Sequence, residues 1–387
     1  MFRRIFDRHK LEVSIISCGD TGQMIGAEMI TTLKSLGANI KSMVITSALE
    51  DDHQKDIFNR VVSIDDTNDG FAKLLDKAVA AAESKSKLIR ETIDRIMPSD
   101  EEGLLLVTTG SGATGLGGAL KVLEILYKDY RKAPPVITLL PEIFENSRVQ
   151  YNMSYFLYKI AFEPGNYGNT ILLLDNKPNF REMDKSFAEV SQRRIKSIPQ
   201  AFADLLYASF EDALSPEFDG NVKDLYEVMH TPGISVFIAE DLSTEDSDAV
   251  DSSRISDVLS ESVISMTSLS KDQVFDSKNA FISLFNIDTT EKLSFQTEFE
   301  ARKLYKSFRE THPFIKFVKP DKKMQGTKPK LRAIISGIPL PNRALQIMRI
   351  ARDTRKRIIY RERDIAKEVL PLDIEEVTRL EDKLYSD

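Results

Sequence analysis

A glycine-rich run between an apolar segment and a helical pattern is the feature that most constrains this chain. The run, TTGSGATGLGGALKVLEILYK, spans Thr108–Lys128 and follows the apolar segment GLLLVT, Gly103–Thr108. Apolar runs of this length are typical of buried strands. A glycine-rich turn from a strand into a helix gathers backbone N–H groups, which can hold an anion. The run does not end in Gly-Lys-Ser/Thr, so it is not a P-loop.

A second glycine cluster, CGDTGQMIGAEM at Cys18–Met29, also lies between a predicted strand, Leu11–Ser17, and a predicted helix. One such turn is common as plain structural punctuation and is a weak signal by itself. Two of them on neighbouring strands of one sheet favour a phosphate pocket, to which the hydroxyls of Ser111 and Thr114 could also donate.

Short apolar runs alternate with amphipathic runs through the first half of the chain, which predicts an α/β fold with a mostly parallel sheet. Residues 181–208 read as one long helix, kinked by Pro199. The later apolar runs suggest a second, smaller α/β domain. We therefore expect four parts, at residues 1–180, 181–208, 209–337 and 338–387, the last one helical.

Composition narrows the class of protein further. The chain has 387 residues, 42% of them hydrophobic, enough for two domains with real cores. Its formal net charge of -7 argues against nonspecific coating of nucleic acid, and its one cysteine, Cys18, excludes an internal disulfide. Cys18 is expected to be a small buried residue at a strand end. No signal-peptide or membrane-spanning pattern is found, so a cytoplasmic protein without direct membrane contact is expected.

The two clusters resemble the signatures of the tubulin/FtsZ superfamily. SGATGLG, Ser111–Gly117, stands where that superfamily carries GGGTGTG or GGGTGSG, with departures at Ser111, Ala113 and Leu116. GDTGQMIG has the glycine spacing of GQCGNQIG in tubulin. The resemblance implies a parallel-sheet GTP-binding domain joined by a long central helix to an activation domain, followed by a C-terminal helix.

The resemblance also implies where GTP or GDP binds. The phosphate contacts would come from the two glycine turns, at Gly19, Asp20, Thr21, Gly22, Gly26, Ser111, Gly112, Ala113, Thr114 and Gly115. LPEIFENSR looks like the ribose segment, with Glu145 as acceptor for sugar hydroxyls and Arg148 beside it. LLLDNKPNF resembles the segment that reads guanine, here through Asn176, which could instead be an ordinary turn residue. Phe187 and Ser191 match the positions that stack on the base and hydrogen-bond it, although Phe187 could equally be core.

In these GTPases a loop of one subunit completes the active site of the next. The matching segment here is PEFDGNVKDLYEVM, Pro216–Met229, in which the two acidic positions of the family fall on Asn221 and Asp224. Asp224 is the candidate group that polarises the attacking water, while Asn221 could orient but not accept a proton. Asp219 could substitute. All three could also belong to a solvated turn and helix cap, which leaves a slow or inactive nucleotide binder open.

Asp20 is a further departure, because a carboxylate in a phosphate loop repels triphosphate unless a cation lies between them. Mg²⁺ bridging is one interpretation. An outward-facing, turn-stabilising Asp20 is the other.

The end of the chain carries SGIPLPNR and then a basic, helical pattern from Arg343 to Arg363. SGIPLPNR resembles the TubZ-type bacterial tubulins, which implies head-to-tail filaments for plasmid or phage DNA segregation and a DNA-binding adaptor of TubR type. The basic helix could dock that adaptor or a neighbouring subunit, or could simply pack on the body. The alternatives are a division or cell-shape filament of FtsZ or archaeal type, and a nucleotide-regulated protein that does not polymerise. In none of these would the chain read nucleic-acid sequence directly.

Overall fold

The structure is a computed structural model in which these residues are described: 12–35, 37–47, 56–67, 69–97, 103–110, 112–142, 144–162, 170–174, 199–200, 202–205, 222–241, 279–285, 316–318, 330–338 and 340–361. The chain divides into two compact units. One, called the glycine unit here, comprises residues 12–30, 40–171 and 340–387. The other, the central unit, comprises residues 1–11, 31–39 and 172–339.

The glycine unit contains a parallel sheet in the order β3-β2-β1-β4-β5. Its strands are β1 (Glu12–Cys18), β2 (Asn39–Thr46), β3 (Arg60–Ser63), β4 (Leu104–Thr109) and β5 (Val136–Leu139). β2 pairs with β3, β1 with β4 and β4 with β5, each in parallel. Every residue of β4 and β5 is buried, as expected for parallel strands covered on both faces.

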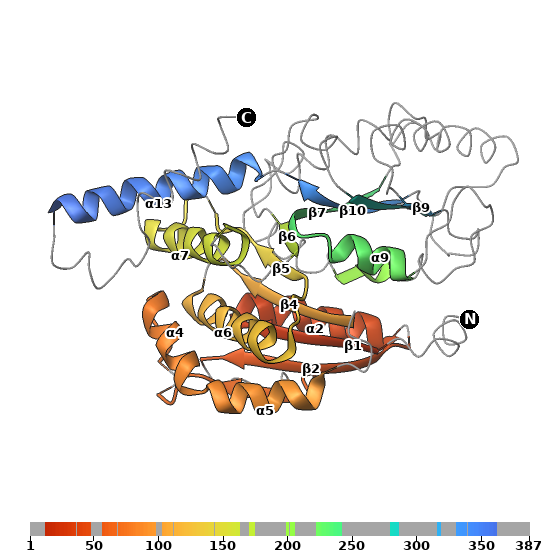
Figure 1. The fold of residues 1–387 in the computed structure, drawn as a ribbon, viewed down its shortest axis with the longest axis horizontal. Helices are drawn as coiled ribbons and strands as arrows, with labels where there is room; N and C mark the ends of the chain where they lie inside the picture. Colours follow the sequence, from red (N-terminus) through yellow and green to blue (C-terminus); the bar gives the residue numbers. More distant parts are fainter. Residues whose placement is uncertain are drawn as a thin grey trace, which may run out of the picture. The chain divides into compact units, whose positions relative to one another are not determined.

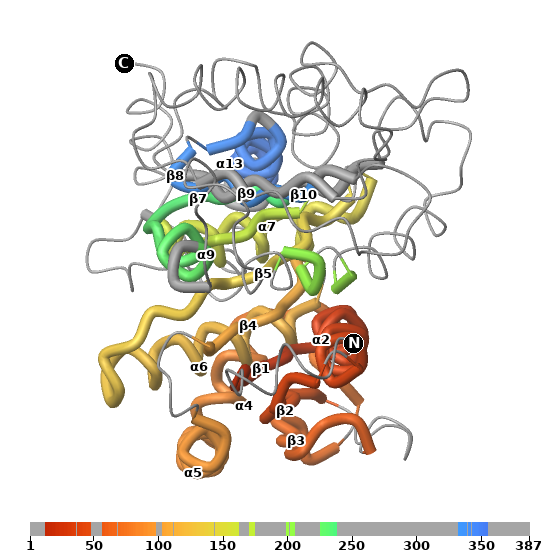
Figure 2. The backbone as a smooth tube through the Cα atoms, turned by 90° about the vertical axis from the view of Figure 1, so that its right-hand side faces the viewer, coloured from red at the N-terminus to blue at the C-terminus, as the bar shows by residue number. Residues whose placement is uncertain are grey.

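Helices α2 (Gly19–Ser35) and α6 (Ala113–Tyr130) cover opposite faces of β1 (Figure 2). Successive side chains of a strand point to opposite faces. The Ser17 side chain faces Gly26 of α2, and the Cys18 side chain faces Gly118 of α6. Cys18 is fully buried, and burial raises the pKa of its thiol, which confirms the expected small buried residue. β1 is therefore the centre of the unit, and each of the two helices that cover it begins at a glycine turn.

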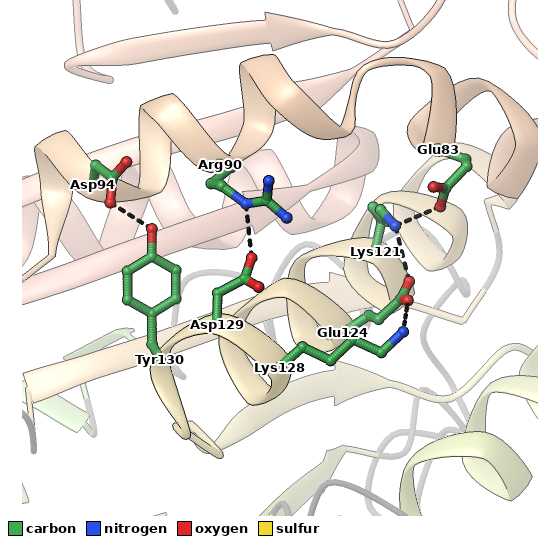
Figure 3. Close-up of polar contacts among 8 residues, drawn as sticks. All are labelled: Glu83, Arg90, Asp94, Lys121, Glu124, Lys128, Asp129 and Tyr130. Carbon is green, nitrogen blue, oxygen red and sulfur yellow. Dashed lines mark hydrogen bonds and ion pairs between the residues drawn. The ribbon is translucent and has the colours of Figure 1, made fainter.

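Two further helices, α4 (Leu75–Ser84) and α5 (Ser86–Ile96), pack against α6. The sequence predicts one helical stretch from Phe71 to Met97, whereas the structure starts later and breaks at Lys85. Figure 3 shows the polar contacts that join these helices to α6. The pairs between helices are Lys121 with Glu83, Arg90 with Asp129, and Tyr130 with Asp94. Within α6, Glu124 pairs with both Lys121 and Lys128. The Lys121 side chain is 9% exposed, and its two carboxylate partners hold its pKa above the usual value despite the opposing effect of burial.

The C-terminal helix α13 (Asn342–Arg361) packs on α7 (Ser147–Leu157) and so belongs to the glycine unit (Figure 1). Its buried face includes Ala344, Ile347, Met348 and Ala351. A one-turn π-helix, η2 (Tyr158–Phe162), follows α7.

The central unit contains the strands β7 (Gly233–Asp241), β8 (Asn279–Phe285), β9 (Lys316–Val318) and β10 (Lys330–Ile338). β10 pairs antiparallel with both β7 and β8, and β8 pairs in parallel with β9. Helix α9 (Val222–Met229) packs on β8 and β10. The buried Arg332 of β10 donates to the carboxylate of Asp204 at 3.1 Å, which ties a helical segment at 202–205 to this sheet.

The predicted α/β class and mostly parallel sheet are confirmed. The apolar run Thr170–Leu174 predicts a strand, and it forms β6 (Thr170–Leu174), which contains the boundary between the two units. The long helix expected at 181–208 lies mostly outside the described residues; 199–200 and 202–205 are helical. The four-part division of the chain stays a prediction.

Candidate nucleotide site

The turn from β1 into α2 is shaped by close backbone contact. Gly19 has a φ of 73°, in the region that favours glycine. A side chain there would lie 2.7 Å from the Cα of Gly115 and 2.8 Å from its nitrogen. A side chain at Gly22 would lie 2.9 Å from the carbonyl oxygen of Val107 in β4. The two glycine turns, distant in sequence, thus touch each other through their backbones.

The turn from β4 into α6 begins in a different environment. Gly112 is the N-cap of α6, with an ordinary extended conformation and without a side-chain cap. Among the described residues, a side chain built on Gly112 would meet nothing within 4 Å. The N–H groups of the first helical turn, at Ala113, Thr114 and Gly115, have no acceptor within an α-helix and carry its positive dipole end. Within the described part of the chain, the space beside this helix start is therefore open.

The predicted residues of both turns converge. Gly19 and Gly115 are in backbone contact, and β1 and β4, which precede the two turns, are parallel neighbours. The N-terminal ends of α2 and α6 therefore open at the same edge of the sheet, where ligands bind in open α/β sheets. Thr21 lies in the first turn of α2, half-buried. Gly26 is a packing glycine, since a side chain there would lie 1.9 Å from Ser17 Oγ.

A third segment, between β3 and α4, adds residues that the sequence did not suggest. A side chain on Gly70, in this segment, would lie 3.8 Å from the Oγ of Ser47, which directly follows β2. The same oxygen accepts a hydrogen bond from the hydroxyl of Thr114 at 3.0 Å. The segment is organised by Asp65, whose carboxylate accepts from the N–H groups of Thr67 and Gly70 at 2.9 and 2.7 Å. These hydrogen bonds hold the pKa of Asp65 below its usual value. Ser47 therefore links this segment to the second glycine turn.

The fourth segment, Pro141–Asn146, follows β5 and carries Glu145. The Glu145 carboxylate accepts from the Glu142 N–H at 3.2 Å, and its second oxygen lies 3.8 Å from Lys73 Nζ. Lys73 itself has a φ of 62°, and its carbonyl accepts from the Asn152 amide at 2.9 Å. Partial burial and the charge of Glu145 raise the pKa of Glu142 to about 7. The expected ribose residue is thus held between a backbone amide and a lysine.

Arg148 lies exposed in the first turn of α7, which Asn146 caps by accepting from the Val149 N–H at 3.1 Å. The structure gives Arg148 no contact with Glu145. Its role in nucleotide binding stays a prediction.

Several predicted site residues lie outside the described residues, namely Ser111, Asn176, Phe187, Ser191, Asn221 and Asp219. Asp224 lies in the first turn of α9, in the central unit. The segment Pro216–Met229 was expected to be a loop, and this is wrong from Val222 onward, where the chain is helical. The roles of Asn221 and Asp224 stay predictions.

Asp20 is exposed in the first turn of α2, where the helix dipole stabilises a carboxylate. Within the described residues, no three His, Cys, Asp or Glu side chains gather as a metal site would require. Cation binding by Asp20 stays a prediction. None of the helices in the described ranges combines the length and apolar content of a membrane span.

No protein-family model matches the sequence, and no curated protein matches it. Solved structures do resemble the chain. CetZ2 from Haloferax volcanii, a GTPγS-bound protofilament, has a TM-score of 0.67 at 17% identity, covering 90% of this chain and 99% of CetZ2. TubZ from Bacillus thuringiensis serovar israelensis, a GTPγS-form protofilament, has a TM-score of 0.67 at 13% identity, covering 93% and 94%. TubZ of Clostridium botulinum phage c-st has a TM-score of 0.57 at 15% identity, covering 90% and 99%. These likenesses show that the chain has the tubulin/FtsZ-like fold.

Proposed function

We propose that the chain binds GTP and GDP at the two glycine turns. The observation that carries the proposal is the backbone contact between Gly19 and Gly115 beside the open helix start at Gly112. Two helix N-termini that meet at one sheet edge turn several backbone N–H donors toward the same side, which suits a polyphosphate. The sequence places glycine where the two turns approach each other closely.

The remaining parts of a nucleotide find suitable residues in the same unit. Glu145 is held near the sheet edge as an acceptor for ribose hydroxyls. Asp20 and phosphate oxygens together would hold Mg²⁺, which would neutralise charge on the triphosphate. Asn176, Phe187 and Ser191 are proposed to read and stack on guanine. A site built on hydrogen bonds rejects the wrong base, because buried polar groups are then left unpaired.

Calorimetric titration with GTP and with ATP tests this proposal. We expect GTP to bind at least about tenfold more tightly than ATP, which is the contribution of one or two hydrogen bonds to the base. Equal affinities would remove guanine from the proposal. Asn176→Ala should weaken GTP binding and leave ATP binding and the melting temperature of the apo protein near those of the wild type.

We further propose that the chain assembles head to tail and hydrolyses GTP between subunits. Similar chains have been solved as protofilaments with GTPγS. Asp224 belongs to a different unit from the glycine turns, so in the family arrangement it would serve a neighbouring subunit. Such a contact does not close on itself and gives filaments.

Phosphate release measured against protein concentration tests the assembly. We expect a threshold, above which the rate rises more steeply than linearly. Asp224→Ala should still bind GTP and pellet with it, but should turn over about 10²–10⁴-fold more slowly. Turnover that is linear in concentration, or wild-type turnover by Asp224→Ala, would assign hydrolysis elsewhere.

The cargo is proposed to be plasmid or phage DNA, held through an adaptor of TubR type at α13. The support is SGIPLPNR and the exposed Arg349 on a helix that is basic overall. Since CetZ2 and the TubZ of Bacillus thuringiensis match the chain with the same TM-score of 0.67, a division or cell-shape filament is the rival. Co-pelleting of filaments with a small DNA-binding protein encoded beside this gene would decide between them.

A further inference from the structure

Arg343 is a cation in an unfavourable place. It is the second residue of α13, at the positive end of the helix dipole, where a positive charge is disfavoured. It is also only 2% exposed, and burying a guanidinium is costly unless its donors are used. Its burial therefore makes a hydrogen bond from the guanidinium important.

That contact is with the segment that carries Glu145. Arg343 Nη2 donates to the carbonyl oxygen of Pro141 at 2.5 Å. Hydrogen bonds from a charged donor are shorter and stronger than neutral ones. α13 packs along α7, which begins directly after this segment (Figure 1). The start of α13 therefore lies close to the Pro141 carbonyl.

The peptide group that Arg343 binds is the one that holds Glu145. The Pro141 carbonyl and the Glu142 N–H belong to a single planar peptide unit, and the chain has no cis peptide among the described residues. In a trans peptide the C=O and N–H point in opposite directions. Arg343 fixes the oxygen on one side, and the Glu142 N–H donates to Glu145 Oε1 on the other at 3.2 Å.

We propose that Arg343 is a positioning residue for the ribose site, acting on the Glu145 carboxylate through the Pro141–Glu142 peptide. The guanidinium sets the plane of that peptide and polarises it, which strengthens the N–H as a donor. Glu145 keeps one oxygen on this N–H and presents the carboxylate to sugar hydroxyls. The ribose part of this inference rests on the proposed function.

Amide hydrogen exchange tests the anchoring without any nucleotide. In Arg343→Met the Glu142 amide should exchange about tenfold faster than in the wild type, since one hydrogen bond to a charged group is weakened. Arg343→Lys keeps a charged donor and should restore most of the protection. Arg349→Met, on an exposed position of the same helix, is the control and should leave it unchanged. Unchanged exchange in Arg343→Met would overturn the anchoring.

Affinities for GTP and 2′,3′-dideoxyGTP test the ribose role. The wild type should prefer GTP by about tenfold or more, the weight of a hydrogen bond to a carboxylate. Arg343→Met and Glu145→Ala should each lose most of that preference while keeping their affinity for the dideoxy analogue. The double variant should lose no more than Glu145→Ala alone, because both act through one carboxylate.

A wild-type preference in folded Arg343→Met would overturn the inference, as would an equal loss in Arg349→Met. If Arg343→Met does not fold, Arg343→Lys decides, with an intermediate preference expected and an unchanged one contradicting the inference. A wild-type chain that binds neither nucleotide would overturn the proposed function and the ribose role together, while the exchange measurement reports on the anchoring separately.

Discussion

The two glycine turns look alike in sequence, and one glycine of the second turn sets them apart. In the β1–α2 turn, added side chains at Gly19, Gly22 and Gly26 would come within 2.9 Å of neighbouring atoms. In the β4–α6 turn, added side chains at Gly110, Gly115, Gly117 and Gly118 would do the same. Among the described residues, a side chain added at Gly112 would meet nothing within 4 Å. Gly112 therefore borders open space, whereas the other described glycines of both turns serve close packing.

This difference decides which substitutions can test binding. Gly115→Val would disturb both the packing of the turn and the binding of an anion, so it cannot separate an effect on stability from an effect on binding. Gly112 can, because the apo structure places no constraint on a side chain there.

Gly22→Val should have the largest effect on stability. Its Cβ would lie 2.9 Å from the Val107 carbonyl oxygen and 3.2 Å from Thr108 Cα, both backbone atoms that cannot rotate away. Overpacking of this kind costs about 3 kcal/mol of unfolding free energy. Urea unfolding of Ala27→Val, on the less buried side of the same helix, is the matched control and should lose less than about 1 kcal/mol. Equal losses would mean that the valine, and not the contact, is responsible.

Gly26→Ala should have a smaller effect that can be reversed. The added methyl group would clash with Ser17 Oγ at 1.9 Å, whereas the next atom, Ser17 Cβ, is 3.1 Å away. We expect a loss of about 1–2 kcal/mol in urea unfolding. Ser17→Ala removes the clashing oxygen and should recover part of that loss in the double variant. Additive losses would contradict a direct clash.

Gly112→Ala should leave stability within about 1 kcal/mol of the wild type, with any change favourable, because alanine adopts this backbone conformation and restricts the unfolded chain. The same change should weaken GTP binding by about tenfold, because the methyl group enters the space beside the first helical turn. Thermal unfolding and calorimetry on one preparation check both halves. Undiminished GTP affinity would remove Gly112 from the phosphate site.

The fourth segment, Pro141–Asn146, has no glycine and carries two carboxylates. Its contribution to stability should therefore depend on pH. The folded protein raises the pKa of Glu142 from 4.5 to about 7, and so binds this proton more tightly than the unfolded chain does. The contribution to stability is full below pH 4.5 and is lost as the pH rises toward 7. Glu142→Gln cannot titrate and should show a smaller decline in unfolding free energy over that interval. Parallel pH profiles for the two proteins would contradict the raised pKa.

The sequence predicts those parts of the fold whose signal is local. β4 and β6 are continuous apolar runs, which predict buried strands, and the glycines mark the starts of α2 and α6. α7 was missed because it buries polar side chains such as Gln150 and Asn152 for hydrogen bonds to distant backbone, which hides its apolar stripe. β3 is only four residues long, too short to show a clear apolar pattern. The family resemblance predicts a loop up to Met229, whereas the apolar spacing of VKDLYEVM is that of the helix α9.

The candidate site likewise has residues that local motifs predict and residues that they do not. Glycine turns and Glu145 were found from motifs, but their supports were not. Ser47 reaches Thr114, Lys73 reaches Glu145, and Arg343 reaches Pro141 only after the chain has folded. No spacing in the sequence connects such partners, since each lies on a different strand–helix connection.

The central claim, that the open turn at Gly112 and its neighbour hold a polyphosphate, is tested most directly by titrating the wild-type protein with GTP and with guanosine in a calorimeter. The two ligands share the base and ribose and differ only in the phosphates that the helix starts would bind. The account predicts one GTP site per chain and an affinity for guanosine at least about a hundredfold lower, since several charge-assisted hydrogen bonds are lost. Equal affinities, or no binding of GTP, would contradict it.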